Sequence, residues 1–366
     1  MTTVLPEGRH DGVREPDALG IGAQRRRTVF WLVTLGAALV VTGVIAVGTG
    51  AVAIGPVTVA RVIAHQAFGL GEVSWPAPAE AIVWQVRLPR VLLAMLVGAG
   101  LAVCGVALQA MVRNVLADPY LLGINSGASS GAAAAILFGA GAGFGRYALP
   151  ASAFLGALAA SLLVFLVARS GGRVTSVRLL LAGVAVGYAL YAATSFLIFA
   201  SGSAEGARSV MFWLLGSLGP ARWDALLAVA AIVIGGTIAG LTVTGRRLDA
   251  LAVGDETAHT LGLSPDRFRL RLLVMVSLCV GVLVSAAGSI GFVGLVVPHL
   301  ARRLVGAPHV RVVPVAALLG AILLVAADVL ARVALAPQEI PIGIITALLG
   351  APFLLILIRR LQGGRP

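Results

Sequence analysis

Lysine is absent from this sequence of 366 residues, so all 27 basic residues are arginines. A phosphate-binding P-loop needs a lysine beside its glycines, which excludes that kind of nucleotide site and predicts that the chain does not hydrolyse ATP itself. Cysteine is scarce too, because Cys104 and Cys279 are the two in the chain and both fall in apolar stretches. A buried thiol behaves as a small apolar group, and we expect no functional disulfide.

Charge is also scarce. Charged residues make up 11% of the chain, against about a quarter in an average soluble domain. Apolar residues reach 59%, and the mean hydropathy is +1.01. The net charge of +12 is carried by arginines dispersed between apolar stretches and does not by itself indicate nucleic acid binding, so we expect no nucleic acid partner. A composition of this kind predicts an integral membrane protein built of helices.

Apolar segments of about the length needed to cross a bilayer recur along the chain. The segment 272–301 has no charge over 30 positions, which is too long for one ordinary span, and Gly288, Gly291, Gly294 and Pro298 interrupt its second half. We interpret it as two helices, the second of them short. The sequence then predicts an all-α membrane domain of about ten spans over 28–361, at 28–48, 91–112, 120–145, 147–168, 179–200, 225–244, 272–301 (two spans), 312–334 and 340–358.

The distribution of arginine predicts the orientation. With ten spans and both termini in the cytoplasm, 20 arginines fall in inner segments and 7 in outer ones, as the positive-inside rule requires. One span over 272–301 would flatten this asymmetry. Residues 1–27 are polar and end in Arg25, Arg26 and Arg27, and we interpret them as a disordered cytoplasmic tail. The predicted location is the cytoplasmic (inner) membrane, with many passes.

Several blocks of the sequence occur in a consistent order from about residue 80 to the C-terminus. The chain resembles the FecCD family of ABC importer permeases, which includes cobalamin, haem and ferric-siderophore transporters. The blocks that carry the resemblance are RLPRVLLAMLVGAGLAVCGVALQAMVRNVLADPYLLGINSGASSGAAAA, GDETAHTLGL, GSIGFVGLVVPHLARRLVG, ADVLARVAL and EIPIGIITALLGAPFLL.

The resemblance implies a cobalamin-permease-like fold, that of a type II ABC importer. It also implies a dimer of ten-helix subunits, expected to be a homodimer, with the substrate passing between the subunits. The implied partners are an extracytoplasmic substrate-binding protein and two cytoplasmic ATPase subunits. We expect this chain to bind no cofactor and no metal, and the partner ATPase to use ATP with magnesium.

Three arginines lie at the outer ends of predicted spans, where the positive-inside rule disfavours them: Arg87 and Arg90 at the second span and Arg332 at the ninth. In the family these positions receive acidic side chains from the two lobes of the binding protein, and a guanidinium suits a carboxylate. The alternative is that Arg332 pairs with Asp328 one helical turn earlier, while Arg87 and Arg90 extend to the membrane interface. Both roles are open for Arg332.

The inner segment 245–271 carries the predicted contact with the ATPase. Its composition favours helix, and Pro265 divides it into two short helices. In the family this loop forms the coupling helices that sit in a cleft of the ATPase, and an ordinary solvated loop is the alternative. The resemblance assigns the contact to Gly254, Asp255, Glu256, Ala258, Leu261 and Gly262.

Thr175 and Ser176 precede the fifth span on its inner side. They match a family position where small hydroxyl residues narrow the translocation path, and capping the following helix is a second role compatible with the first. His299 suggests a metal ligand, but no second ligand lies at a suitable spacing, and a hydrogen-bonded structural histidine is favoured. Asp328 lies within a span, where Arg332 provides a partner, so we favour a structural ion pair over a proton relay.

The sequence therefore predicts the permease subunit of an ABC importer, not an enzyme, that works by alternating access driven by ATP in partner subunits. An iron-siderophore, haem or cobalamin is the expected class of substrate. A proton-coupled secondary transporter using Asp328 is the alternative, and it predicts transport without an ATPase. A passive channel would need a ring of polar residues along a pore, and the sequence offers none.

Overall fold

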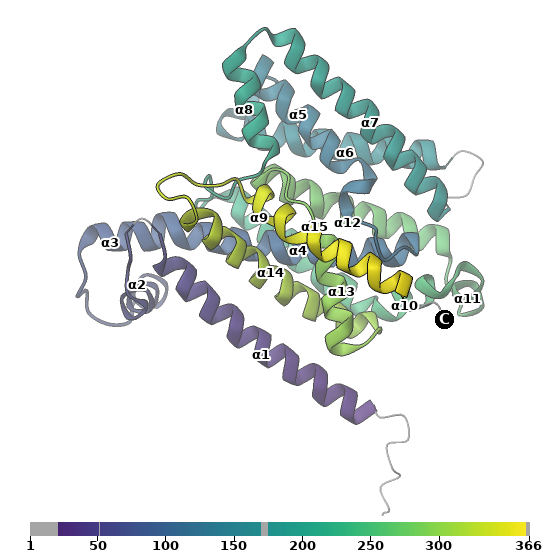
Figure 1. Ribbon diagram of the computed structural model, residues 1–366, viewed down its shortest axis with the longest axis horizontal. Coiled ribbons are helices and arrows are strands. Elements are labelled where there is room, and N and C mark those ends of the chain that lie inside the picture. Colours follow the sequence, from purple (N-terminus) through teal and green to yellow (C-terminus); the bar gives the residue numbers. More distant parts are fainter. Residues whose placement is uncertain (1–20, 51, 170–174, 364–366) are drawn as a thin grey trace, which may run out of the picture.

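The computed structural model describes residues 21–50, 52–169 and 175–363, and within these ranges every regular element is a helix. Figure 1 shows the helices as one bundle, with the first helix, α1 (Ile21–Gly48), along one side. α1 begins before the apolar run at residue 28, so 28 marks the start of hydrophobicity and not the start of the helix. Residues 1–20 of the predicted cytoplasmic tail lie outside the described ranges.

Helices occur at all ten predicted spans. Among the described residues, seven stretches of helix are long and apolar enough to cross a membrane, while α5, α13 and the apolar part of α15 (Ile342–Leu357) are shorter. The predicted all-helical membrane fold is thus confirmed. The ten helices are α1, α4 (Leu88–Val112), α5 (Ile124–Phe138), α6 (Ala148–Ala168), α7 (Ser176–Ser201), α9 (Ala225–Val243), α12 (Pro265–Ala287), α13 (Val293–Val305), α14 (His309–Val333) and α15 (Ile342–Gly363).

The division of the long apolar segment 272–301 is confirmed. α12 ends at Ala287 and α13 begins at Val293. Gly288 between them has φ 70° and Phe292 has φ 67°, values that end a right-handed helix. The Tyr120 hydroxyl holds this break in place, because it donates to the Ile290 carbonyl at 2.9 Å and accepts from the Ile290 amide at 2.8 Å.

Short helices mark the two ends of the bundle. α2 (Pro56–Phe68) and α3 (Ala77–Ala81) lie at one end, which we call the α2 end. α10 (Gly245–Val253) and α11 (Asp255–Thr260) lie at the opposite end, which we call the α11 end (Figure 1). A π-helical turn, Ile82–Arg87, joins α3 to α4, and α8 (Ala204–Leu214) follows α7. The predicted outer and inner contact segments therefore lie at opposite ends of the molecule.

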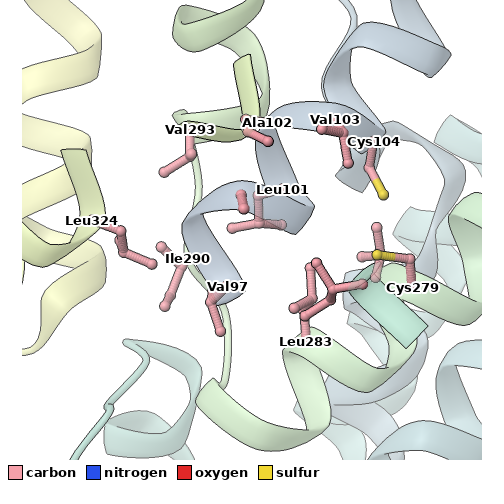
Figure 2. Packing of buried hydrophobic residues seen from close by; sticks show 14 of the residues in the cluster. Val97, Leu101, Ala102, Val103, Cys104, Cys279, Leu283, Ile290, Val293 and Leu324 are labelled. Atoms are coloured by element: carbon pink, nitrogen blue, oxygen red, sulfur yellow. The ribbon is translucent and has the colours of Figure 1, made fainter. Parts of the chain in front are cut away.

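α4 is the central helix. It packs against α9, α12, α13 and α14, and most of its side chains are buried because it is apolar on every face. Figure 2 shows part of this core, with Val97 and Leu101 of α4 near Leu283 of α12. Cys104 and Cys279 are both free, buried thiols within it.

Close helix packing depends on glycine. A Cβ added at Gly98 of α4 would collide with the carbonyl oxygen of Gly320 in α14, and one at Gly105 would collide with that of Gly294 in α13. Gly127 of α5 meets α6 in the same way. Without side chains, the backbones approach closely enough for van der Waals packing to hold helices together in lipid, where no hydrophobic effect acts between them.

Candidate functional site

Arg87, the first of the three predicted docking arginines, is buried at the α2 end with 7% of its surface exposed. Its Nη1 donates to the carbonyls of Val47 and Gly48, each at 3.0 Å, and its Nη2 donates to the carbonyl of Val52 at 2.6 Å. The last carbonyls of a helix have no partner within the helix. The guanidinium therefore caps the C-terminus of α1 and directs its donors into the chain.

Arg332, which lies on α14, caps the same C-terminus of α1. Its Nη1 donates to the Thr49 carbonyl at 2.6 Å and its Nη2 to the Ala46 carbonyl at 2.9 Å. Its Nε lies 3.0 Å from the Asp328 carboxylate, one turn earlier in the same helix. The expected pair of Arg332 with Asp328 is thus confirmed. With 8% exposure, Arg332 offers little surface to a partner protein.

Arg90 is placed differently. Its Nη2 lies 2.9 Å from Asp328, which is buried, and its Nη1 lies 2.9 Å from Glu339. The Glu339 side chain is 51% exposed, and that of Arg90 is 13% exposed. Of the three arginines, Arg90 is the one that pairs with an exposed carboxylate, that of Glu339, so its ion pair reaches the surface of the protein.

Asp255 is the best-anchored residue of the predicted coupling segment. Both of its carboxylate oxygens accept from Arg269 of α12, at 2.9 Å and 2.6 Å. This bidentate hydrogen bond lowers the pKa of Asp255, and the charges of Arg269, Arg113 and His259 lower it further against the opposing effect of burial. Asp255 is therefore held as a carboxylate at the first position of α11.

The other residues of the predicted ATPase contact differ in exposure. Leu261 is 66% exposed, and Glu256 is also exposed. The side chain of Ala258 is fully buried, so it packs within the chain. Gly262 ends the turn with φ 77°, a conformation that disfavours residues with a Cβ, and Gly254 separates α10 from α11. Leu261 and Glu256 form the surface that a partner could touch.

Thr175 and Ser176 begin α7 at the α11 end. The Thr175 hydroxyl accepts from the Arg178 amide at 3.4 Å, which confirms its capping role. Thr175 is exposed, whereas Ser176 is buried and donates to the Met111 carbonyl of α4 at 3.1 Å. Ser176 thus joins α7 to α4, and a gate at Thr175 and Ser176 stays a prediction.

A second anchor of the coupling segment was not predicted. Asp249 of α10 accepts from the backbone amide of His309 at 2.9 Å and contacts the ring Nδ1 of the same residue at the start of α14. Burial raises the pKa of Asp249, and the hydrogen bonds and charge of His309 more than offset this, so the pKa lies below its ordinary value. Glu339 and Arg269 were also missed. The sequence does hold a signal for Arg269: the apolar residues Phe268, Leu272 and Val276 recur at helical spacing, and Arg269 falls on the same side of the helix, which is buried in the structure.

His299 and Asp328, two further candidates for a functional role, both contact neighbouring side chains within the bundle. The ring of His299 lies edge-on to Phe353, with 6.3 Å between the centroids. Within the described ranges no group of three His, Cys, Asp or Glu residues could hold a metal ion. Asp328 has an arginine on each side, so its carboxylate takes part in ion pairs with Arg90 and Arg332 within the bundle.

The comparisons with known proteins agree with the fold. Residues 38–360 match the model of the FecCD transport family. The chain is 45% identical to the cobalamin import permease of Halobacterium salinarum over 78% of this chain and 75% of that one. It is 42% identical to the hemin transport permease of Yersinia pestis over 80% and 88%. A solved structure described as an inward-facing metal-chelate type ABC transporter superposes with a TM-score of 0.78 at 33% identity, over 90% of this chain and 98% of that one. The chain belongs to the FecCD transport family.

Proposed function

We propose that this chain is the membrane-spanning permease subunit of an ABC importer that carries an iron-siderophore, haem or cobalamin into the cytoplasm. The relatives named for cobalamin and hemin transport support the class of cargo. The proposed location is the cytoplasmic membrane, with both termini and the α11 end on the cytoplasmic side. The alternative transporter driven by protons through Asp328 is disfavoured by the two arginines that pair with this carboxylate.

The proposal is supported most directly by the way in which α10 and α11 are held at the α11 end. A two-helix segment, α10 and α11, is fastened to the bundle by Asp249 and Asp255, while Leu261 stays 66% exposed at its tip. A segment fixed to the bundle in this way presents Glu256 and Leu261 in a defined position to another protein. The proposed partners at this end are two cytoplasmic ATPase subunits, which would bind and hydrolyse ATP with magnesium; this chain does no covalent chemistry.

A second permease subunit is also part of the proposal, as a homodimer. Large apolar side chains stand exposed along α7, including Leu181, Tyr188, Tyr191 and Phe199. A membrane subunit can cover such a face with lipid or with a second copy. In the proposed mechanism the substrate passes between the two copies, and ATP-driven movement of α10 and α11 tilts the helices around this path, with Thr175 and Ser176 near its inner end.

At the α2 end, we propose that an extracytoplasmic substrate-binding protein docks through its acidic side chains. We assign this contact to Arg90, because the guanidinium groups of Arg87 and Arg332 already donate hydrogen bonds to the carbonyls at the end of α1. Glu339 occupies the outward donor of Arg90 in this structure. A carboxylate of the binding protein would replace it there, a contact of the same chemistry.

The test is co-purification of the tagged chain with candidate ATPase and binding-protein subunits. Glu256→Arg with Leu261→Arg changes the exposed surface at the α11 end without touching the Asp255 anchor, and Arg90→Gln changes the α2 end. We expect the first variant to lose the ATPase selectively and the second to lose the binding protein selectively. A wild-type chain that recovers neither partner and still transports in liposomes would overturn the proposal.

A further inference from the structure

Arg269 is the point at which four helices meet at the α11 end. It stands on α12 and is 1% exposed. Its guanidinium holds Asp255 of α11 by two hydrogen bonds, its Nη2 lies 3.3 Å from the Ser176 hydroxyl of α7, and its Nε lies 3.5 Å from the Met111 carbonyl of α4. The Ser176 hydroxyl donates to that same carbonyl at 3.1 Å. One side chain thus touches the proposed ATPase-binding segment, the proposed gate and the central helix.

The charge of Arg269 explains why these contacts hold together. A buried guanidinium without a counter-ion costs several kcal/mol, so Arg269 is retained in this place by Asp255. Asp255 in turn lies at the start of α11, where a carboxylate also interacts favourably with the amide groups of the first turn. Moving α11 away from the bundle would strip Arg269 of its only acidic partner among the described residues.

The planar guanidinium presents its donors in fixed directions. Two edges of the group point to different helices, Asp255 on one and Ser176 with Met111 on the other. A displacement of Asp255 therefore turns or pulls the group as a unit and changes its bonds to α7 and α4. A flexible lysine ammonium could keep the ion pair without transmitting such a change.

We infer that Arg269 is the positioning residue that links α11 to the first turn of α7 and the last turn of α4, so that a partner seated on α11 changes the proposed gate through this one side chain. This inference rests on the proposed function, because it takes α11 as the site of ATPase contact. The competing explanation is that Arg269 stabilises the fold alone and that α7 responds to the partner by another route.

The test is hydrogen exchange of the full chain, alone and with its ATPase subunit, in wild type, Arg269→Lys and Arg271→Gln. Arg271 is an exposed arginine of the same helix and serves as the matched control. In the chain alone, Arg269→Lys should speed exchange in the first turns of α7 about tenfold, the effect of losing one hydrogen bond to a charged group. Arg271→Gln should leave these turns unchanged.

Adding the ATPase separates the inference from the proposed function. In wild type we expect slower exchange both in α11, by direct contact, and in the first turns of α7, at a distance. Arg269→Lys should keep the protection of α11 and lose that of α7. If α7 is protected equally in the lysine variant, the link through Arg269 is wrong. If α11 of the wild type is not protected at all, the proposed ATPase contact is wrong, while the experiment on the chain alone still tests the link.

A second variant covers the case in which Arg269→Lys does not fold. Ser176→Ala removes the bond toward α7 and leaves the pair of Arg269 with Asp255 in place. It should reproduce the loss of distant protection in α7 with α11 still protected. Unchanged protection of α7 in this variant would overturn the inference.

Discussion

Arg90 and Asp328 are 238 residues apart in the sequence and form an ion pair at 2.9 Å in the interior of the α2 end. The same carboxylate lies 3.0 Å from Arg332, and only 1% of its side chain is exposed. One acidic group therefore balances two guanidinium groups that α4 and α14 bring together. This cluster joins the central helix to the C-terminus of α1, which Arg332 also caps.

Asp328→Asn should destabilise the protein, because it leaves two arginines buried with no carboxylate between them. Breaking a buried ion pair costs about 3 kcal/mol or more, and the change is measured as a lower melting temperature of the purified chain. Glu339→Gln is the control, since its side chain is half exposed and its pair should contribute under about 1 kcal/mol. Unchanged melting with abolished transport would instead support a proton relay at Asp328.

Arg87→Gln should loosen the end of α1. The variant loses the charged donors to Val47, Gly48 and Val52, and we expect a loss of about 2 kcal/mol in the free energy of unfolding. Hydrogen exchange should rise locally around residues 44–54. Arg61→Gln, at an exposed site of α2, provides the comparison. Normal stability with lost binding-protein affinity would show that Arg87 acts in docking.

Gly105→Ala should be costly although alanine favours helix. The added methyl group would meet the carbonyl of Gly294, so α4 and α13 must separate, at a cost of about 2 kcal/mol. Gly36→Ala in α1 is a matched substitution with no atom within 4 Å of the new Cβ, and it should be neutral or slightly stabilising. Equal melting temperatures for the two variants would contradict the packing described for α4.

Acid should release α11 at a low pH. The pKa of Asp255 is lowered in the fold, so its contribution to anchoring is complete above the ordinary value of 3.8 and is lost as the pH falls through the lowered pKa. Exchange in α11, corrected for the intrinsic rates, should stay constant from pH 7 to pH 5. Asp255→Asn should show fast exchange already at pH 7. Release of α11 near pH 6 in wild type would mean that another group controls it.

Much of the fold could be predicted from the sequence, because hydrophobicity and length decide which segments are helices in a membrane. The break between α12 and α13 followed from Gly288 and Gly291 within an uncharged run. The start of α1 could not be predicted from hydrophobicity, because the helix begins before the apolar run and includes Arg25, Arg26 and Arg27. Arginine favours helix although it is charged.

The site was harder to predict, because the sequence does not show which groups meet. Arg332 and Asp328 are one turn apart, so their pair could be foreseen. The approach of Arg90 to Asp328, or of Arg269 to Asp255 and Ser176, depends on how whole helices pack. The same packing decides exposure, and it places Arg87 and Ala258 in the interior although both were predicted to contact partner proteins.

The measurement that tests the account most directly is uptake into proteoliposomes that contain the chain with or without its ATPase subunit. Radiolabelled cyanocobalamin, haemin and a ferric hydroxamate siderophore are the probes, each presented with the binding protein. We expect at least one probe to accumulate, and we expect this accumulation to require both the ATPase and ATP. Accumulation of a probe by the chain alone, without ATP, would contradict it.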